Sequence, residues 1–196
     1  MSTTQQIDAT GTEALLKELV CAIVSKPEEL RVVSQWTKER DGCFFGIKGA
    51  PADDGILLGK QRSHFDALDA VMDRIGYAQR KTFTLAIRTT PMLDEPPRRE
   101  FVQSFEHDPK KSAELLRRIL VAMGISDFRI EVGPDSIARH GLSFVFTIHT
   151  TDYFAGILLR FFEDDPGESL VTVMGTLWRA IAMRQGVRYQ INVETA

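Results

Sequence analysis

An internal repeat constrains the fold of this 196-residue chain more than any other feature. The tetrapeptide GILL occurs at 55–58 and again at 156–159, an offset of 101 residues. At nearly the same offset, ALLKELVCAI (14–23) lies over ELLRRILVAM (114–123), and FGIK (45–48) lies over FTIH (146–149). After the second GILL the offset grows to about 106, with the extra residues around FFEDDPG. Three matched blocks in one order predict two copies of one structural unit.

Each copy predicts the same order of elements, namely a helix, two strands, a short helix, a longer helix and a strand. In the first copy we expect them at 13–25, 30–36, 43–49, 53–58, from Ser63 onward, and at 82–88, with an Asp41-Gly42 turn between the first two strands. The second copy has strand-like FRIEV and LSFVFTIHT around a loop that carries Gly133, Pro134 and Gly141. This order suggests an α+β fold in which helices cover one face of each three-stranded sheet, with the two copies packed together.

Proline marks the boundary between the copies. Four of the eight prolines are Pro91, Pro96, Pro97 and Pro109. We therefore expect a flexible N-terminus (1–12), a first domain (13–90), a Pro-rich linker (91–111) and a second domain (112–196). The apolar spacing in RREFVQSFEH leaves open a short helix within the linker.

A loop between the two middle helices of the first copy carries the main candidate for a functional motif. It reads Gly59-Lys60-Gln61-Arg62 and is followed by Ser63, a favourable N-cap. The N-terminus of a helix attracts phosphate, glycine permits close approach of a backbone, and the two cations are placed to meet successive phosphates. The loop is therefore a candidate clamp for a nucleic-acid backbone, with a plain interhelical turn as the alternative.

The segment LLGKQR (57–62) resembles the GxxG loop of KH domains, commonly IGKQG, except that Arg62 replaces the last glycine. With the element order, residues 13–88 are similar to the bacterial type II KH domain and to small bacterial single-KH proteins that bind RNA. The resemblance implies a clamp for single-stranded RNA made by Gly59, Lys60, Gln61, Arg62 and Ser63, beside an apolar groove at Ile56, Leu57 and Leu58. Arg62 either obstructs the groove or adds a phosphate contact.

The second copy resembles the KH fold but lacks the clamp. GILL is followed there by RFFEDDPG, which has lost both glycines and places three acids where phosphate would lie. We interpret this copy as a degenerate KH-like domain. Arg160, Phe161 and Phe162 are its candidates for a protein interface.

Charge limits the strength of any nucleic-acid contact. The net charge of the chain is −3; residues 11–90 carry 12 Lys+Arg and 11 Asp+Glu, and residues 101–196 carry 10 and 12. Neither half is strongly basic, so we expect weak to moderate RNA binding focused on the loop. The alternative is a KH-scaffold protein-interaction or assembly module that has lost nucleic-acid binding, with another KH or RNA-associated protein as partner. The sequence leaves the oligomeric state open.

No motif indicates an enzyme, a cofactor or a metal site. Hydrolase, zinc-protease, nucleotide and dinucleotide motifs do not occur, Cys21 and Cys43 lie in apolar runs, and the four histidines form no ligand pair on a helix. No stretch is apolar enough to span a membrane and the first twelve residues are polar, so a cytoplasmic location is expected.

Four phenylalanines raise the question of base stacking on the sheets. They are Phe44, Phe45, Phe144 and Phe146. Strand alternation and burial preference favour core packing over a base-stacking platform. Trp36 ends a strand beside a charged turn, and its exposure is left open.

Overall fold

The computed structural model of the chain describes residues 9–37, 42–88, 108–135, 142–162 and 165–195. Within these ranges the protein has six helices and two three-stranded mixed sheets, which confirms the expected α+β class. The Asp41 turn position, Gly141 and the helix considered for RREFVQSFEH lie outside the described residues.

The first repeat forms the order of elements that its sequence predicts. Its helices are α1 (Ala9–Ile23), α2 (Asp54–Leu58) and α3 (Ser63–Gln79), and its strands are β1 (Arg31–Thr37), β2 (Gly42–Lys48) and β3 (Thr82–Ile87). Short 3₁₀ turns occupy Pro27–Glu29, Pro51–Asp53 and Lys60–Arg62. In the sheet, β2 is central, antiparallel to β1 and parallel to β3.

The second repeat has the same order and the same sheet topology. It comprises α4 (Pro109–Ala122), β4 (Phe128–Pro134), β5 (Ser143–Thr150), α5 (Asp152–Leu159), α6 (Leu170–Gln185) and β8 (Arg188–Thr195), with β5 central. The inserted residues form a small antiparallel pair, β6 (Phe161–Phe162) and β7 (Asp165–Ser169). Two expectations were wrong here. Gly133 and Pro134 belong to β4, and α4 already begins at Pro109, where Asp108 accepts hydrogen bonds from the first-turn amides.

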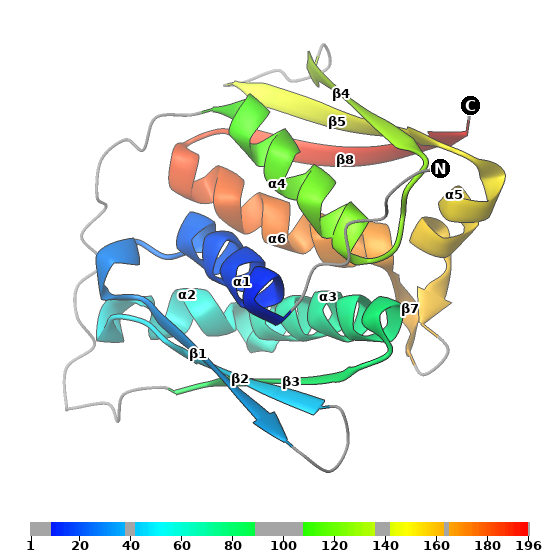
Figure 1. Cartoon of the computed structure of the whole chain (residues 1–196). Helices are drawn as coiled ribbons and strands as arrows, with labels where there is room; N and C mark the ends of the chain where they lie inside the picture. The colour runs from blue at the N-terminus through cyan, green and yellow to red at the C-terminus, as the bar shows by residue number, and fades with distance from the viewer. Residues whose placement is uncertain (1–8, 38–41, 89–107, 136–141, 163–164, 196) are drawn as a thin grey trace.

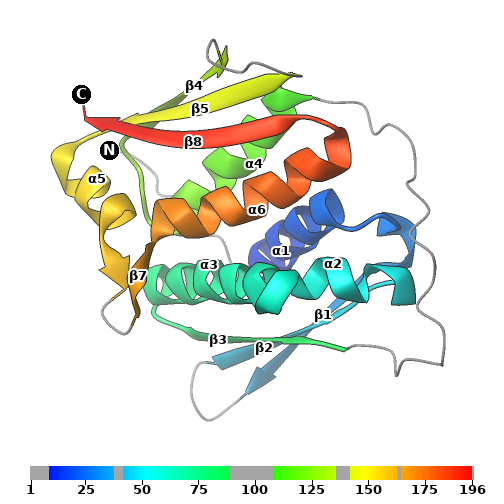
Figure 2. The ribbon, with the colours of Figure 1, turned by 180° about the vertical axis from the view of Figure 1, so that it is seen from behind.

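The helices of both repeats lie between the two sheets. Figures 1 and 2 show α1, α3, α4 and α6 as a central layer, with β1–β2–β3 on one side and β4–β5–β8 on the other. The buried apolar residues of both repeats form one continuous cluster, in which α3 packs against α6. Each sheet therefore buries one face on the shared helices and leaves its other face outward.

Equivalent aromatic pairs confirm the alignment of the repeats. Phe45 meets Phe83 edge to face at 5.3 Å between ring centroids, and Phe146 meets Tyr189 in the same way at 5.0 Å. Both phenylalanines are fully buried, as expected from strand alternation. The same packing unit therefore supports each sheet.

Polar contacts join the repeats beside the apolar core. Arg184 at the end of α6 donates to the backbone carbonyl of Cys21 on α1, and Arg118 of α4 pairs with Glu18 of α1. The carboxylate of Asp53 also acts on Arg184, raising its pKa against the larger lowering effect of burial. The two repeats thus share both apolar and charged contacts.

Candidate nucleic-acid interface

The start of α2 is fixed by a buried carboxylate. Asp53 is fully buried and accepts hydrogen bonds from Ser25 N (2.9 Å), the Ser25 hydroxyl and Lys26 N (3.0 Å). These contacts tie the segment after α1 to α2. Because α2 has only five residues, its position depends on such external contacts.

Glycine is required at the first position of the loop that follows. Gly59 has φ 72° and ψ 174°, a conformation that is almost restricted to glycine. A Cβ atom at this position would lie 2.7 Å from the backbone nitrogen of His64 and 2.7 Å from its ring. The His64 ring is held by a contact of 2.6 Å between Nδ1 and the carbonyl of Ile56. The sequence motif therefore reflects a real steric need.

The next residues of the loop are strained. Gln61 has φ 54° and Arg62 has φ 66°, so two consecutive residues with side chains occupy the left-handed region. Such a conformation costs about 1 kcal/mol or more for each residue other than glycine. Arg62 therefore adopts a backbone conformation that glycine, the residue of the GxxG pattern, would adopt without strain.

The side chains of Lys60, Gln61 and Arg62 are exposed. The Arg62 guanidinium lies 4.6 Å from the centre of the Phe65 ring, and its Nε is 3.9 Å from Asp66 Oδ1. Lys60 makes no ion pair with any residue that the structure describes. One of the two loop cations is therefore free for an anion, and the other is already engaged.

The N-terminus of α3 has no side-chain cap. The expected N-cap, Ser63, is the first helical residue instead, and Arg62 occupies the N-cap position without a capping hydrogen bond. By contrast, Asp108 caps α4 and Ser169 caps α6. The uncapped amides of α3 therefore lie beside the two loop cations.

Carboxylates line α3 beyond the loop. Asp66, Asp69 and Asp73 follow one another at helical spacing. Burial and the neighbouring Asp73 raise the pKa of Asp69, while the Leu85 amide and Arg62 lower it, and burial raises the pKa of Asp73. The sequence analysis missed Asp69 and Asp73, although their spacing was visible, and all three acids oppose an anion on this side of the loop.

The expected apolar groove is only partly available. Ile56 and Leu58 are half-buried, but Leu57 is fully buried in the core and cannot contact a base, so its assignment to the groove was wrong. The GILL motif is thus in part a packing motif: Leu158, the equivalent of Leu57, is also fully buried.

The second repeat replaces the loop with the β6–β7 pair. Arg160 ends α5 and is exposed, whereas the side chains of Phe161 and Phe162 lie outside the described part of the structure. The sequence analysis missed two other apolar side chains of α5, Tyr153 and Leu159, which are exposed.

The remaining candidate groups have local explanations. Cys43 is buried and Cys21 partly buried, and burial raises the pKa of both thiols. His149 lies between Glu131 (3.3 Å) and Glu194 (3.5 Å), one at each ring nitrogen. In the described ranges no cluster of His, Cys, Asp or Glu is arranged to hold a metal, and no helix has the length and hydrophobicity needed to cross a bilayer.

Comparison of the chain with protein-family models gave no match, and no curated protein or solved structure matched it significantly.

Proposed function

We propose that the chain is a non-enzymatic, KH-like protein that contacts the backbone of single-stranded RNA through the loop from Gly59 to Arg62. The strained loop backbone carries this proposal. Gln61 and Arg62 hold left-handed conformations side by side, and backbone strain of this kind concentrates at ligand-binding sites. In this loop it exposes two cations beside uncapped helix amides.

In this proposal the loop residues have different roles. Lys60 meets one phosphate, and the first-turn amides of α3 meet the same or the next phosphate. Gly59 lets the loop take the conformation that exposes Lys60, because a side chain at Gly59 would collide with His64. Arg62 exchanges Asp66 for a phosphate, while Ile56 and Leu58 offer apolar area to a base. Two phosphate contacts predict modest affinity.

The same contacts favour one alternative, a protein-interaction module that has lost RNA binding. Arg62 already has Asp66 and Phe65 as partners, and Asp69 and Asp73 extend the negative charge along α3. A surface of alternating charge beside the short helix α2 would suit a protein partner better than a phosphate backbone.

Fluorescence anisotropy with short labelled single-stranded RNAs at two salt concentrations tests the proposal. We expect binding that weakens with salt, with the two phosphates at the loop contributing about −1.4 to the logarithmic slope. The variant Lys60→Asp/Arg62→Asp should lose binding, and the control Lys17→Asp/Lys110→Asp, which changes two exposed lysines elsewhere, should retain it.

A third variant tests whether Arg62 contacts a phosphate, as the RNA-binding proposal requires. Asp66→Asn releases Arg62 and should tighten RNA binding if Arg62 meets a phosphate. Unchanged affinity in the Lys60→Asp/Arg62→Asp variant would remove the loop from the binding site. No binding by the unmodified chain at either salt concentration would favour the protein-interaction module.

A further inference from the structure

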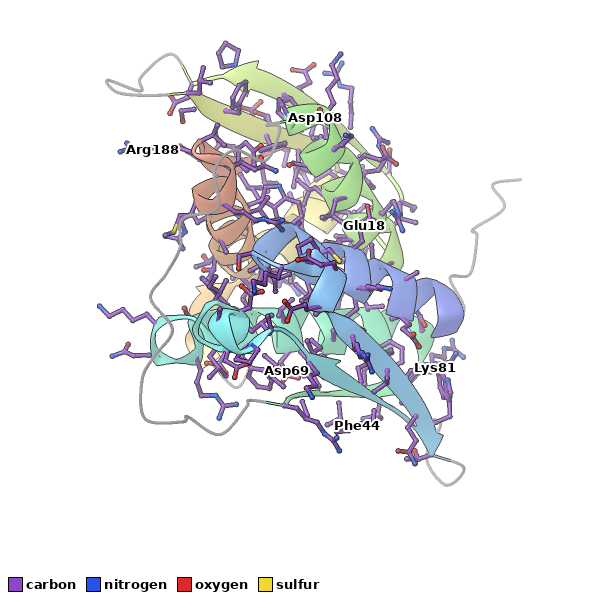
Figure 3. All side chains as sticks on the ribbon, turned by 90° about the vertical axis from the view of Figure 1, so that its left-hand side faces the viewer. Glu18, Phe44, Asp69, Lys81, Asp108 and Arg188 are labelled. Atoms are coloured by element: carbon purple, nitrogen blue, oxygen red, sulfur yellow. The ribbon has the colours of Figure 1, made fainter. Side chains whose placement is uncertain are left out.

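The outward face of the first sheet has a composition that packing does not explain. Phe44 lies on this face and is 40% exposed, contrary to the expected core position. Figure 3 shows its side chain on the side of the sheet away from the helices. Val33 of the neighbouring strand is 62% exposed on the same face. An exposed aromatic ring thus stands on the central strand of an open sheet.

Small and apolar residues lie beside the partly exposed Phe44 ring. Gly46 follows two positions along β2, and a Cβ there would lie 3.1 Å from Val33 Cγ2 and 3.7 Å from Phe44 Cε1. Gly46 is paired with Val33 on one side and with Ala86 on the other. Val33 and the edge of the Phe44 ring therefore lie over Gly46, and together with Ala86 they form an apolar area on this face.

Three cations border this area, and no acid lies on this face among the residues that the structure describes. Arg31 and Lys48 are paired across β1 and β2, and Arg88 follows β3 and donates its amide to the carbonyl of Ile47 at 2.8 Å. All three side chains are exposed and make no ion pair with described residues. By strand alternation the other described residues of the face are uncharged: Val33, Gln35, Thr37, Gly42, Phe44, Gly46, Thr82, Thr84 and Ala86.

The second sheet provides an internal comparison, because the register of its strands matches that of the first. Val145 occupies the place of Phe44, and the places of Arg31, Lys48 and Arg88 belong to Arg129, His149 and Glu194. There the charges neutralise one another. Arg129 pairs with Glu131 at 2.8 Å, and His149 lies between Glu131 and Glu194. The same architecture therefore exists without an exposed aromatic ring on its described outward face and with Arg129 and His149 paired, although Arg188, at the place of Thr82, makes no ion pair with described residues.

We infer that the outward face of β1, β2 and β3 is a second RNA-contact surface, on which a base stacks on Phe44 while Arg31, Lys48 and Arg88 meet phosphates. Single strands are bound by aromatic rings on open sheets combined with cations that follow the backbone. The absence of acids on the described face favours this polyanion over a protein of mixed charge. The inference takes its ligand class from the proposed function but uses none of the loop residues.

Three variants of the 196-residue chain test this surface by anisotropy with a labelled single-stranded 12-mer RNA. Phe44→Leu keeps apolar area but removes the aromatic face, and should weaken binding about tenfold, whereas Phe44→Tyr should retain it. Arg31→Glu/Lys48→Glu removes two phosphate contacts, so the logarithmic salt slope should shrink by about 1.4. Lys17→Asp/Lys110→Asp, with the same change in net charge, is the control. Circular dichroism establishes that each variant is folded.

The loop variant Lys60→Asp/Arg62→Asp, measured in parallel, distinguishes the two proposals. Binding that is lost in the loop variant but unchanged in Phe44→Leu and Arg31→Glu/Lys48→Glu supports the loop and overturns the sheet surface. Binding that is lost only in the sheet variants supports the sheet surface and overturns the loop. Losses in both support both sites, and no RNA binding by the unmodified chain overturns both.

Discussion

Replacing the buried carboxylate of Asp53 should destabilise the whole molecule. Asp53→Ala removes the acceptor of two backbone amides, Ser25 N and Lys26 N, and of the Ser25 hydroxyl. It also removes the negative charge that acts on the partly buried guanidinium of Arg184. Because the hydroxyl can rotate toward water, the cost comes chiefly from the two amides and from Arg184.

The expected loss follows from the contacts. A buried donor left without an acceptor costs about 1–3 kcal/mol. Ser25 is only half-buried and Lys26 is exposed, so water compensates in part. We therefore expect Asp53→Ala to lower the free energy of unfolding by about 2–4 kcal/mol. Asp53→Asn keeps one acceptor oxygen and should lose about half as much.

Equilibrium unfolding in urea, followed by circular dichroism and tryptophan fluorescence, measures this loss. Asp152→Ala is the matched control, since Asp152 is an exposed carboxylate in the first turn of α5 and should contribute less than about 1 kcal/mol. A loss below about 1 kcal/mol in Asp53→Ala would refute the reasoning. It would mean that Ser25 and Lys26 exchange Asp53 for water at no net cost.

Three further predictions concern stability. Arg80 ends α3 at φ 57°, where Gly186 ends α6 at φ 68°, so Arg80→Gly should raise the free energy of unfolding by about 0.5–1 kcal/mol, measured in urea, and Gly186→Arg should lower it. Burial raises the pKa of Asp73 above the ordinary aspartate value of 3.8, so the folded state holds this proton more tightly, and the stabilisation from the bound proton is lost as pH rises through the pKa of the folded state. Asp73→Asn should therefore be more stable than the unmodified chain at pH 7, with the advantage vanishing below pH 3.8 in thermal melts. Finally, one shared core predicts a single unfolding transition, with Trp178 fluorescence and circular dichroism coincident; separate transitions would contradict it.

The sequence repeat predicted most of the fold because the buried core residues recur at equivalent positions in the two copies. Phe45 and Phe146, and Leu57 and Leu158, are buried at equivalent positions in the two copies. The spacing of GILL therefore carried information about the core. The spacing gave no information about how the two copies pack together. Some helix faces pack on a sheet and others pack on the other repeat, and both kinds of face are apolar.

The candidate surfaces were harder to predict, although the sequence held some of their signals. The GxxG pattern has a glycine at the position that Arg62 occupies here, which indicates a positive φ, and Arg62 does have a positive φ. Side chains alternate between the two faces of β2, so Phe44 and Lys48 share one face and Phe45 lies on the other. Because a charged side chain is expected to face solvent, Lys48 indicated that Phe44 faces outward. The pairing of Arg62 with Asp66 depends on side-chain conformations that spacing alone does not determine.

Comparing the two repeats shows which residues the fold requires and which it does not. Both sheets bury an aromatic pair of nearly identical geometry, so the inward residues are required for packing. On the outward faces the second repeat reaches the same topology with Val145 and His149 where the first has Phe44 and Lys48. Folding alone therefore demands neither the exposed ring nor the free cation. The first repeat, which exposes Phe44 on the same face as Lys48, a cation unpaired among the described residues, is also the one that holds the strained, cationic loop. Because both departures from good packing fall on the same copy, binding is a more economical explanation for them than two independent accidents of sequence.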